Sequence, residues 1–198
     1  RKESENLLPE IFSDNASKQN AGIVLGGLNI PADRKLICIC PASVHFTKTY
    51  PAEQYAELIN RFDENTFAFL LTGKGEDKKI IEEIKSVSAK NVYDLCDKLN
   101  IAELSEVMKR CDLVICGDTG PMHIAEGLDK PFIVLAGSSV KEFGFYPQSI
   151  NSVVLENNNL NCRPCSHIGK SYCPKGHFKC MKEITPDKVL NTAMKLLN

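Results

Sequence analysis

The sequence predicts an α/β fold built around a doubly wound parallel sheet. Short apolar segments rich in β-branched and aromatic residues recur along the chain, separated by segments with the periodicity of amphipathic helices. These short segments are apolar at almost every position, which is typical of strands covered by helices on both faces. Six strands are expected, at residues 36–40, 67–71, 92–95, 113–116, 132–135 and 153–155.

The helices follow from the spacing of apolar residues and from their boundary signals. After the first strand, Tyr55, Leu58 and Phe62 share one helical face, and Pro51 marks the start of that helix. A weaker pattern predicts an outer helix near the N-terminus, and a clear amphipathic pattern predicts a closing helix at the C-terminus. The remaining helices are expected at residues 14–27, 80–84, 101–108 and 186–197.

Length and charge allow one domain and argue against a polyanionic partner. The 198 residues are 43% hydrophobic, and 24 basic against 25 acidic residues leave a formal net charge of −1. No nucleic-acid partner is therefore expected, and a phosphate ligand would have to be held locally. No apolar run approaches the roughly 18 residues needed to cross a bilayer, so a soluble protein is expected.

The chain divides into two parts on its sequence pattern. Residues 1–34 are expected to be a linker and a packing helix, and residues 35–198 one domain with a Cys-rich loop at 156–185. The absence of an initiator methionine suggests a fragment of a longer protein. Nine cysteines, several of them in apolar strands, indicate a reducing compartment.

The most informative turn follows the fourth expected strand and opens a helix. Gly117, Thr119 and Gly120 make it small and flexible, and Pro121 suits the first helical position. Parallel sheets bind ligands beyond the carboxyl ends of their strands, where helix N-termini present free N–H groups to anions. Asp118 would repel a phosphate, so we expect it to face hydroxyls that the phosphate carries. The alternative is that Asp118 or Thr119 only caps the helix.

Two more loops at the same expected edge carry polar side chains. After the first strand, Ser43 and Thr47 can donate to phosphate oxygens, and Lys48 can offset charge on a departing phosphate; a surface lysine is the alternative. After the second strand, Gly73 allows close approach and Glu76 can bind a ribose, unless it only favours a helix N-terminus. Together the loops suit a nucleotide diphosphate attached to a hydroxylated group.

These residues resemble glycosyltransferase family 9, the ADP-heptose lipopolysaccharide heptosyltransferases, and specifically their C-terminal donor-binding half. The match includes Lys48-Thr49-Tyr50-Pro51 and Gly73-Lys74-Gly75-Glu76, and the string Asp118-Thr119-Gly120-Pro121-Met122-His123-Ile124-Ala125 is its most specific part. The resemblance implies a GT-B enzyme, in which two Rossmann-like domains face each other across a cleft. This chain would be the second of those domains and would bind the ADP-sugar donor.

The resemblance implies a role for each residue on the nucleotide side. Lys48 would hold the ADP phosphates and assist their departure, with Ser43 as a further donor. Glu76 would bind the adenosine ribose, and the backbone near Leu99 would meet the adenine.

The resemblance also implies that Thr119 and Gly120 bind the pyrophosphate and that Asp118 binds the heptose hydroxyls. His123 would line that pocket, whereas Met122, Ile124 and Leu128 are assigned to the helix core. The family usually has a small apolar residue at Glu126 and Phe-Gly-Pro-Thr at residues 136–139. Because both departures border the sugar pocket, they affect the identity of the sugar more than the ADP portion.

The implied reaction is direct displacement with inversion, transferring a heptose to a lipopolysaccharide core acceptor without a required cofactor. The general base, an aspartate in this family, would sit in an N-terminal half outside this chain, so the chain alone should bind donor without turnover. The resemblance implies a cytoplasmic location or a peripheral one on the inner face of the inner membrane. A sugar-nucleotide epimerase or hydrolase on the same scaffold is one rival function.

The Cys-rich loop supports a second rival. Cys162, Cys165, Cys173 and Cys180 form a C-x2-C-x7-C-x6-C arrangement, and four thiolates can close a tetrahedral zinc site. Free or disulfide-linked thiols are the alternative. With zinc, the chain could be a non-catalytic interaction module stapled by the metal.

Overall fold

Six parallel strands form one sheet in the order β3-β2-β1-β4-β5-β6 in the computed structural model, which describes residues 9–88 and 91–198. The order is that of nucleotide-binding doubly wound sheets. Every strand end lies within one residue of its predicted place. Of the expected linker and packing helix at residues 1–34, residues 1–8 lie outside the described residues. The strands are β1 (Lys35–Cys40), β2 (Phe67–Leu71), β3 (Val92–Asp94), β4 (Leu113–Gly117), β5 (Phe132–Ala136) and β6 (Ser152–Glu156).

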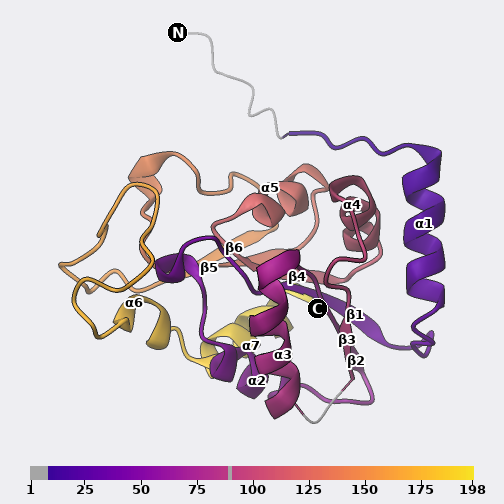
Figure 1. The fold of residues 1–198 in the computed structure, drawn as a ribbon, viewed down its shortest axis with the longest axis horizontal. Coiled ribbons are helices and arrows are strands. Elements are labelled where there is room, and N and C mark those ends of the chain that lie inside the picture. The colour runs from indigo at the N-terminus through magenta and orange to yellow at the C-terminus, as the bar shows by residue number, and fades with distance from the viewer. Residues whose placement is uncertain (1–8, 89–90) are drawn as a thin grey trace, which may run out of the picture.

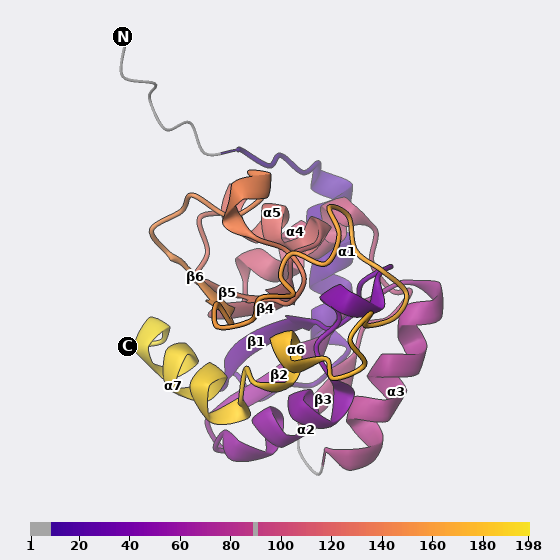
Figure 2. The same ribbon diagram turned by 90° about the vertical axis from the view of Figure 1, so that its left-hand side faces the viewer.

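Helices cover both faces of the sheet, which confirms the predicted doubly wound class (Figures 1 and 2). One layer holds α1 (Asn15–Gly26), α4 (Ile101–Lys109) and α5 (Gly120–Gly127). The opposite layer holds α2 (Ala52–Arg61), α3 (Lys78–Val87) and α7 (Pro186–Leu196), while α6 (Lys179–Lys182) lies in the segment expected to be irregular.

Alternation along the strands builds two separate cores. In β1, Ile37 and Ile39 pack with α2, α3 and α7, whereas Cys38 and Cys40 pack with α1, α4 and α5. All four side chains are at most 3% exposed, so the two thiols act as small buried hydrophobes. A one-residue shift in register would exchange the two sets, which is why the sheet accepts only one pairing.

Side-chain caps fix where several helices begin. Asn100 accepts from the Glu103 amide and Glu103 returns a contact to the Asn100 amide, forming a capping box at α4. Thr185 accepts from the Lys188 amide at α7, and Asp14 accepts from the Ser17 amide at α1. These caps satisfy backbone amides in the first turns of α1, α4 and α7.

The sheet reverses its winding between β1 and β4, and the loops after these strands diverge to opposite faces. Such a switch point leaves a crevice at the carboxyl ends of the strands. The backbone approaches closely there: a Cβ at Gly117 would lie 3.0 Å from the Lys48 carbonyl oxygen. A Cβ at Gly137 would lie 2.6 Å from the Thr47 carbonyl oxygen and 2.8 Å from Met181 Cε.

We therefore predict that Gly137→Ala destabilises the chain by about 1–3 kcal/mol, because the new methyl overlaps backbone that cannot retreat. The matched control is Gly26→Ala in α1, where a Cβ would meet nothing within 4 Å. That change should stabilise the chain by about 0.5–1 kcal/mol through its helix propensity. Urea unfolding of both variants measures the difference, and equal stability of the two would contradict the close approach.

Candidate functional site

A cavity of about 570 Å³ opens at the carboxyl ends of the strands. Its volume lies in the range of small-molecule sites. The loops that follow β1, β2, β3 and β4 line it, so the structure brings together most of the residues that the sequence singled out. These are Ser43, Lys48, Gly73, Leu99, Asp118, Thr119 and Gly120.

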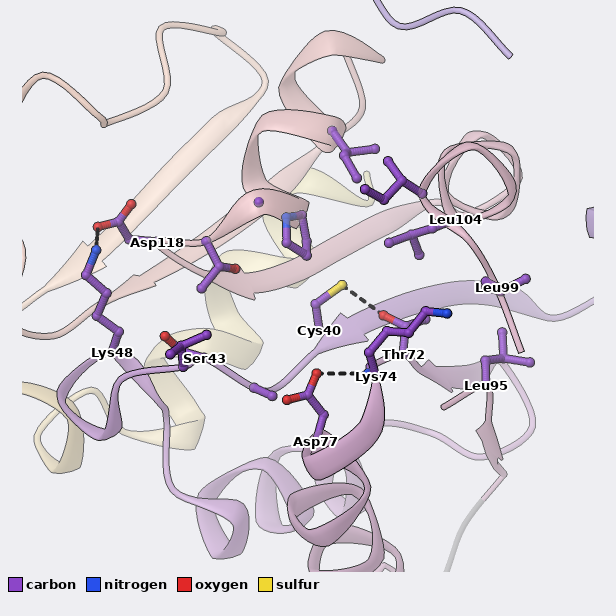
Figure 3. A pocket seen from close by; sticks show the side chains of 18 of the residues that line it. Cys40, Ser43, Lys48, Thr72, Lys74, Asp77, Leu95, Leu99, Leu104 and Asp118 are labelled. Atoms are coloured by element: carbon purple, nitrogen blue, oxygen red, sulfur yellow. Dashed lines mark hydrogen bonds and ion pairs between the residues drawn. The ribbon is translucent and has the colours of Figure 1, made fainter. Parts of the chain in front are cut away.

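An ion pair lies at one end of this cavity (Figure 3). Lys48 Nζ and Asp118 Oδ2 are 2.8 Å apart, and their side chains are only 14% and 6% exposed. Ser139 Oγ donates to the same oxygen at 2.5 Å. Asp118 Oδ1 has no hydrogen-bond partner in the described part of the chain. One carboxylate oxygen is thus committed to the protein and the other is available to a ligand.

The helix-capping alternative for the Asp118 turn is wrong. Thr119 occupies the N-cap position of α5 but makes no side-chain cap hydrogen bond, and its hydroxyl contacts the Gly117 carbonyl at 3.4 Å. Asp118 turns its carboxylate toward Lys48 instead. The turn therefore serves the cavity rather than the helix end.

The other end of the cavity is an apolar wall. Leu95, Leu99 and Leu104 lie opposite the ion pair in Figure 3, and Ile101 and Ile124 complete the lining. Ile124 was assigned to the helix core alone; it is 9% exposed and packs in the core, but it also lines the cavity. One end of the cavity is thus an apolar surface suited to a flat ring, and the other end has a lysine suited to an anion.

Asp77, not Glu76, faces this cavity. Asp77 Oδ2 accepts from the Lys74 amide at 2.9 Å, and Asp77 lines the cavity wall between the ion pair and the leucines. Glu76 has an 87% exposed side chain that pairs with Lys79, and this contact lowers the pKa of Glu76. Glu76 instead lines a neighbouring cavity, so the structure does not place it in the cavity of Lys48 and Asp118.

Thr47 and His123 also lie outside the cavity. The Thr47 side chain is buried behind the loop, where its hydroxyl accepts from the Lys170 amide at 2.9 Å. His123 has a half-exposed side chain on α5, with Nδ1 3.9 Å from Glu126 Oε2. The structure therefore gives Thr47 a role within the fold, and it does not bring His123 to this cavity.

The four cysteines of the Cys-rich loop are free thiols in this structure. Within residues 9–88 and 91–198, no group of three or more Cys, His, Asp or Glu side chains is arranged to hold a metal. Burial and the neighbouring Cys173 thiol raise the pKa of Cys180 to about 11. Burial also raises the pKa of Cys165.

The model of glycosyltransferase family 9 (heptosyltransferase) matches residues 4–175. The chain belongs to glycosyltransferase family 9. Lipooligosaccharide heptosyltransferase 2 of Campylobacter jejuni is 29% identical over 168 residues, which cover 83% of this chain and 51% of that protein. The chain therefore spans about half the length of the curated relatives it matches.

Solved structures of the family share the fold. A family 9 glycosyltransferase from Veillonella parvula aligns with a TM-score of 0.81 over 95% of this chain and 53% of its own, at 21% identity. The ADP-heptose lipopolysaccharide heptosyltransferase II of Escherichia coli aligns with a TM-score of 0.79 over 98% of this chain and 55% of its own, also at 21% identity. The GT-B type of Rossmann-like domain expected from the sequence is thereby confirmed.

No helix among the described residues of this family 9 chain combines the length and the apolar character needed to span a membrane.

We predict that the thiols of the Cys-rich loop differ in reactivity. Alkylation of the folded chain at pH 8 should modify Cys162 and Cys173, which are partly exposed, before Cys180, whose buried thiol stays protonated below a pKa of about 11. After unfolding without reductant, all nine cysteines should react. Mass spectrometry reads both results, and a protected pair in the unfolded chain would instead reveal a disulfide.

Proposed function

We propose that this chain is the donor-binding half of a heptosyltransferase and that its cavity binds ADP-heptose. The observation that carries the proposal is the nearly buried Lys48–Asp118 pair, which faces an apolar wall across one cavity. A cation with an adjacent free carboxylate oxygen suits a phosphate joined to a hydroxylated sugar. The family membership supports the transferase class, and the name of the E. coli structure supports the nucleotide.

The nucleotide would lie along the cavity from the leucines to the lysine. Adenine would pack against Leu95 and Leu99, where a flat apolar ring buries well. The ribose hydroxyls would donate to Asp77, whose Oδ1 is not used by the Lys74 amide. The diphosphate would lie at the N-terminus of α5, where free backbone amides near Gly120 and the Lys48 ammonium supply positive charge.

The sugar would lie beyond the diphosphate, beside Asp118. Its hydroxyls would donate to Oδ1, while Lys48 and Ser139 hold Oδ2. A lysine already bonded to a carboxylate can move its charge toward the leaving diphosphate as the glycosidic bond breaks. The lysine would thereby stabilise the departing group more than the bound donor, which is the requirement for catalysis.

The complete reaction requires residues outside this chain. A base from the facing half would activate an acceptor hydroxyl of a lipopolysaccharide core, and attack at the anomeric carbon would expel ADP with inversion. The acceptor, and a location at the inner face of the bacterial inner membrane, belong to the same proposal. Donor loss without acceptor in the full-length protein would instead favour the hydrolase alternative.

We predict that the chain binds ADP and that Lys48→Ala weakens this binding by on the order of 10- to 100-fold, because a charge-assisted contact is lost. Asp118→Ala should leave ADP binding intact but remove the extra affinity for ADP-heptose. Lys175→Ala is the matched control, since Lys175 is an exposed lysine away from this cavity. Isothermal titration calorimetry measures all four proteins, and equal ADP binding by wild type and Lys48→Ala would refute the site.

A second prediction separates the two adjacent acids. Asp77→Asn should weaken the binding of ADP by about 10-fold, because an amide is a poorer acceptor for ribose hydroxyls than a carboxylate. The amide oxygen can still accept from the Lys74 amide, so the turn should survive. Glu76→Gln removes the same charge one residue away and should leave the affinity for ADP unchanged. The reverse ranking in calorimetry would return the ribose contact to Glu76.

A further inference from the structure

The Cys-rich loop, residues 156–185, contacts the loop that carries Lys48, through Thr47, and the loop that follows β5, through Gly137 and Ser139. It also contributes Ile168 to the lining of the cavity. We propose that this loop positions the Lys48–Asp118 pair, and that Arg163 is the positioning residue. The inference deepens the proposed function, because it concerns the same site.

Arg163 is buried among carbonyl groups rather than exposed to solvent. Its side chain is 4% exposed, and Nε donates to the Gly137 carbonyl at 2.6 Å. Nη2 donates to the Ser139 carbonyl at 2.6 Å, and Nη1 donates to the Asn157 carbonyl at 2.7 Å. A planar guanidinium can reach all three carbonyls at once, whereas a lysine ammonium cannot. Arg163 thus fixes the backbone of the loop that follows β5.

The charge of Arg163 is balanced within the same cluster. Nη2 lies 2.8 Å from Glu156 Oε2, and Tyr146 donates to that oxygen at 2.7 Å. Burial would raise the pKa of Glu156, but these hydrogen bonds outweigh burial and lower it. The Tyr146 hydroxyl also lies 3.1 Å from the Ser139 carbonyl. Displacing the guanidinium of Arg163 would break its three carbonyl contacts and its ion pair at the same time, so its position is strongly fixed.

One path runs from this support to Asp118. Arg163 holds the Ser139 carbonyl, and the Ser139 hydroxyl donates to Asp118 Oδ2, the oxygen that also binds Lys48. Ser139 is 2% exposed, so its hydroxyl has little freedom to turn elsewhere. The rotamer of Asp118, and hence the direction of its free oxygen, depends on the place of Ser139.

A second path runs to Lys48. Thr47 donates its amide to the Lys170 carbonyl at 3.1 Å, and the Lys170 amide donates to the Thr47 hydroxyl. Ser138, beside the residues that Arg163 holds, contacts the Thr47 hydroxyl at 3.1 Å and donates its amide to the Thr47 carbonyl at 3.2 Å. The residue before Lys48 is therefore tied to the Cys-rich loop directly and through Ser138.

The first experiment needs no ligand. Brief acylation of the folded chain, read by mass spectrometry, compares labelling of Lys48 with labelling of the exposed Lys175. Arg163→Gln should raise Lys48 labelling several-fold, because the lysine is no longer held against its carboxylate. Arg163→Lys should be intermediate, since it keeps the charge facing Glu156 but not the three carbonyl contacts. Unchanged Lys48 labelling in Arg163→Gln would overturn the proposal.

The second experiment asks whether Arg163 acts through Ser139. Arg163→Gln and Ser139→Ala should each weaken ADP-heptose binding by about 10-fold, and the double variant should be no weaker than either one. Ser139→Thr, which keeps the hydroxyl, should retain binding, and Lys175→Gln is the matched charge control. Independent effects that multiply in the double variant would overturn the path through Ser139.

The two experiments distinguish a failure of the proposed function from a failure of the role proposed for Arg163. A wild-type chain that binds no ADP would refute the proposed function, while the labelling of Lys48 would still decide the role of Arg163. If Arg163→Gln does not fold, Ser139→Ala and Arg163→Lys carry the test. A general loosening would raise labelling at every lysine, whereas positioning raises it at Lys48 alone.

Discussion

The contact between Lys48 and Asp118 is the interaction on which the rest of the site depends. Removing one partner of a buried ion pair costs about 3–5 kcal/mol, because the other charge stays dehydrated and unpaired. A further hydrogen bond stabilises this ion pair: the Ser139 hydroxyl donates to Asp118 Oδ2, the oxygen that also binds Lys48. Asp118 keeps one oxygen free, so the pair can face a ligand without losing its internal partner.

The sheet makes this contact possible by bringing two backbones very close together. Strands β1 and β4 are neighbours whose following loops diverge to opposite layers, and only glycine at position 117 lets the Lys48 backbone pass within reach. The same holds for Gly137 beside Thr47. The cores on both faces of the sheet hold the strands from which these loops start. The Cys-rich loop adds hydrogen bonds to Thr47, Gly137 and Ser139.

Much of the candidate site could be predicted from the sequence, because parallel strands end at one edge and their loops must gather there. That argument alone brings Ser43, Gly73 and Asp118 to one cavity. It fails where the direction of a side chain decides the outcome. Glu76 and Asp77 are consecutive residues of one 3-10 turn, so their side chains diverge by about 120°, and only the Asp77 carboxylate turns toward the cavity.

By itself, the sequence determined the order and limits of the six strands, the helices between them and the edge of the sheet where the polar loops gather. These features depend on local periodicity and on the fixed geometry of a parallel sheet. Only the tertiary structure decided that Thr47 faces the interior, that Asp77 rather than Glu76 lines the cavity and that Arg163 bonds to the Ser139 carbonyl from a distant loop. Those contacts join residues far apart in the chain, and no local pattern encodes the direction in which such side chains point.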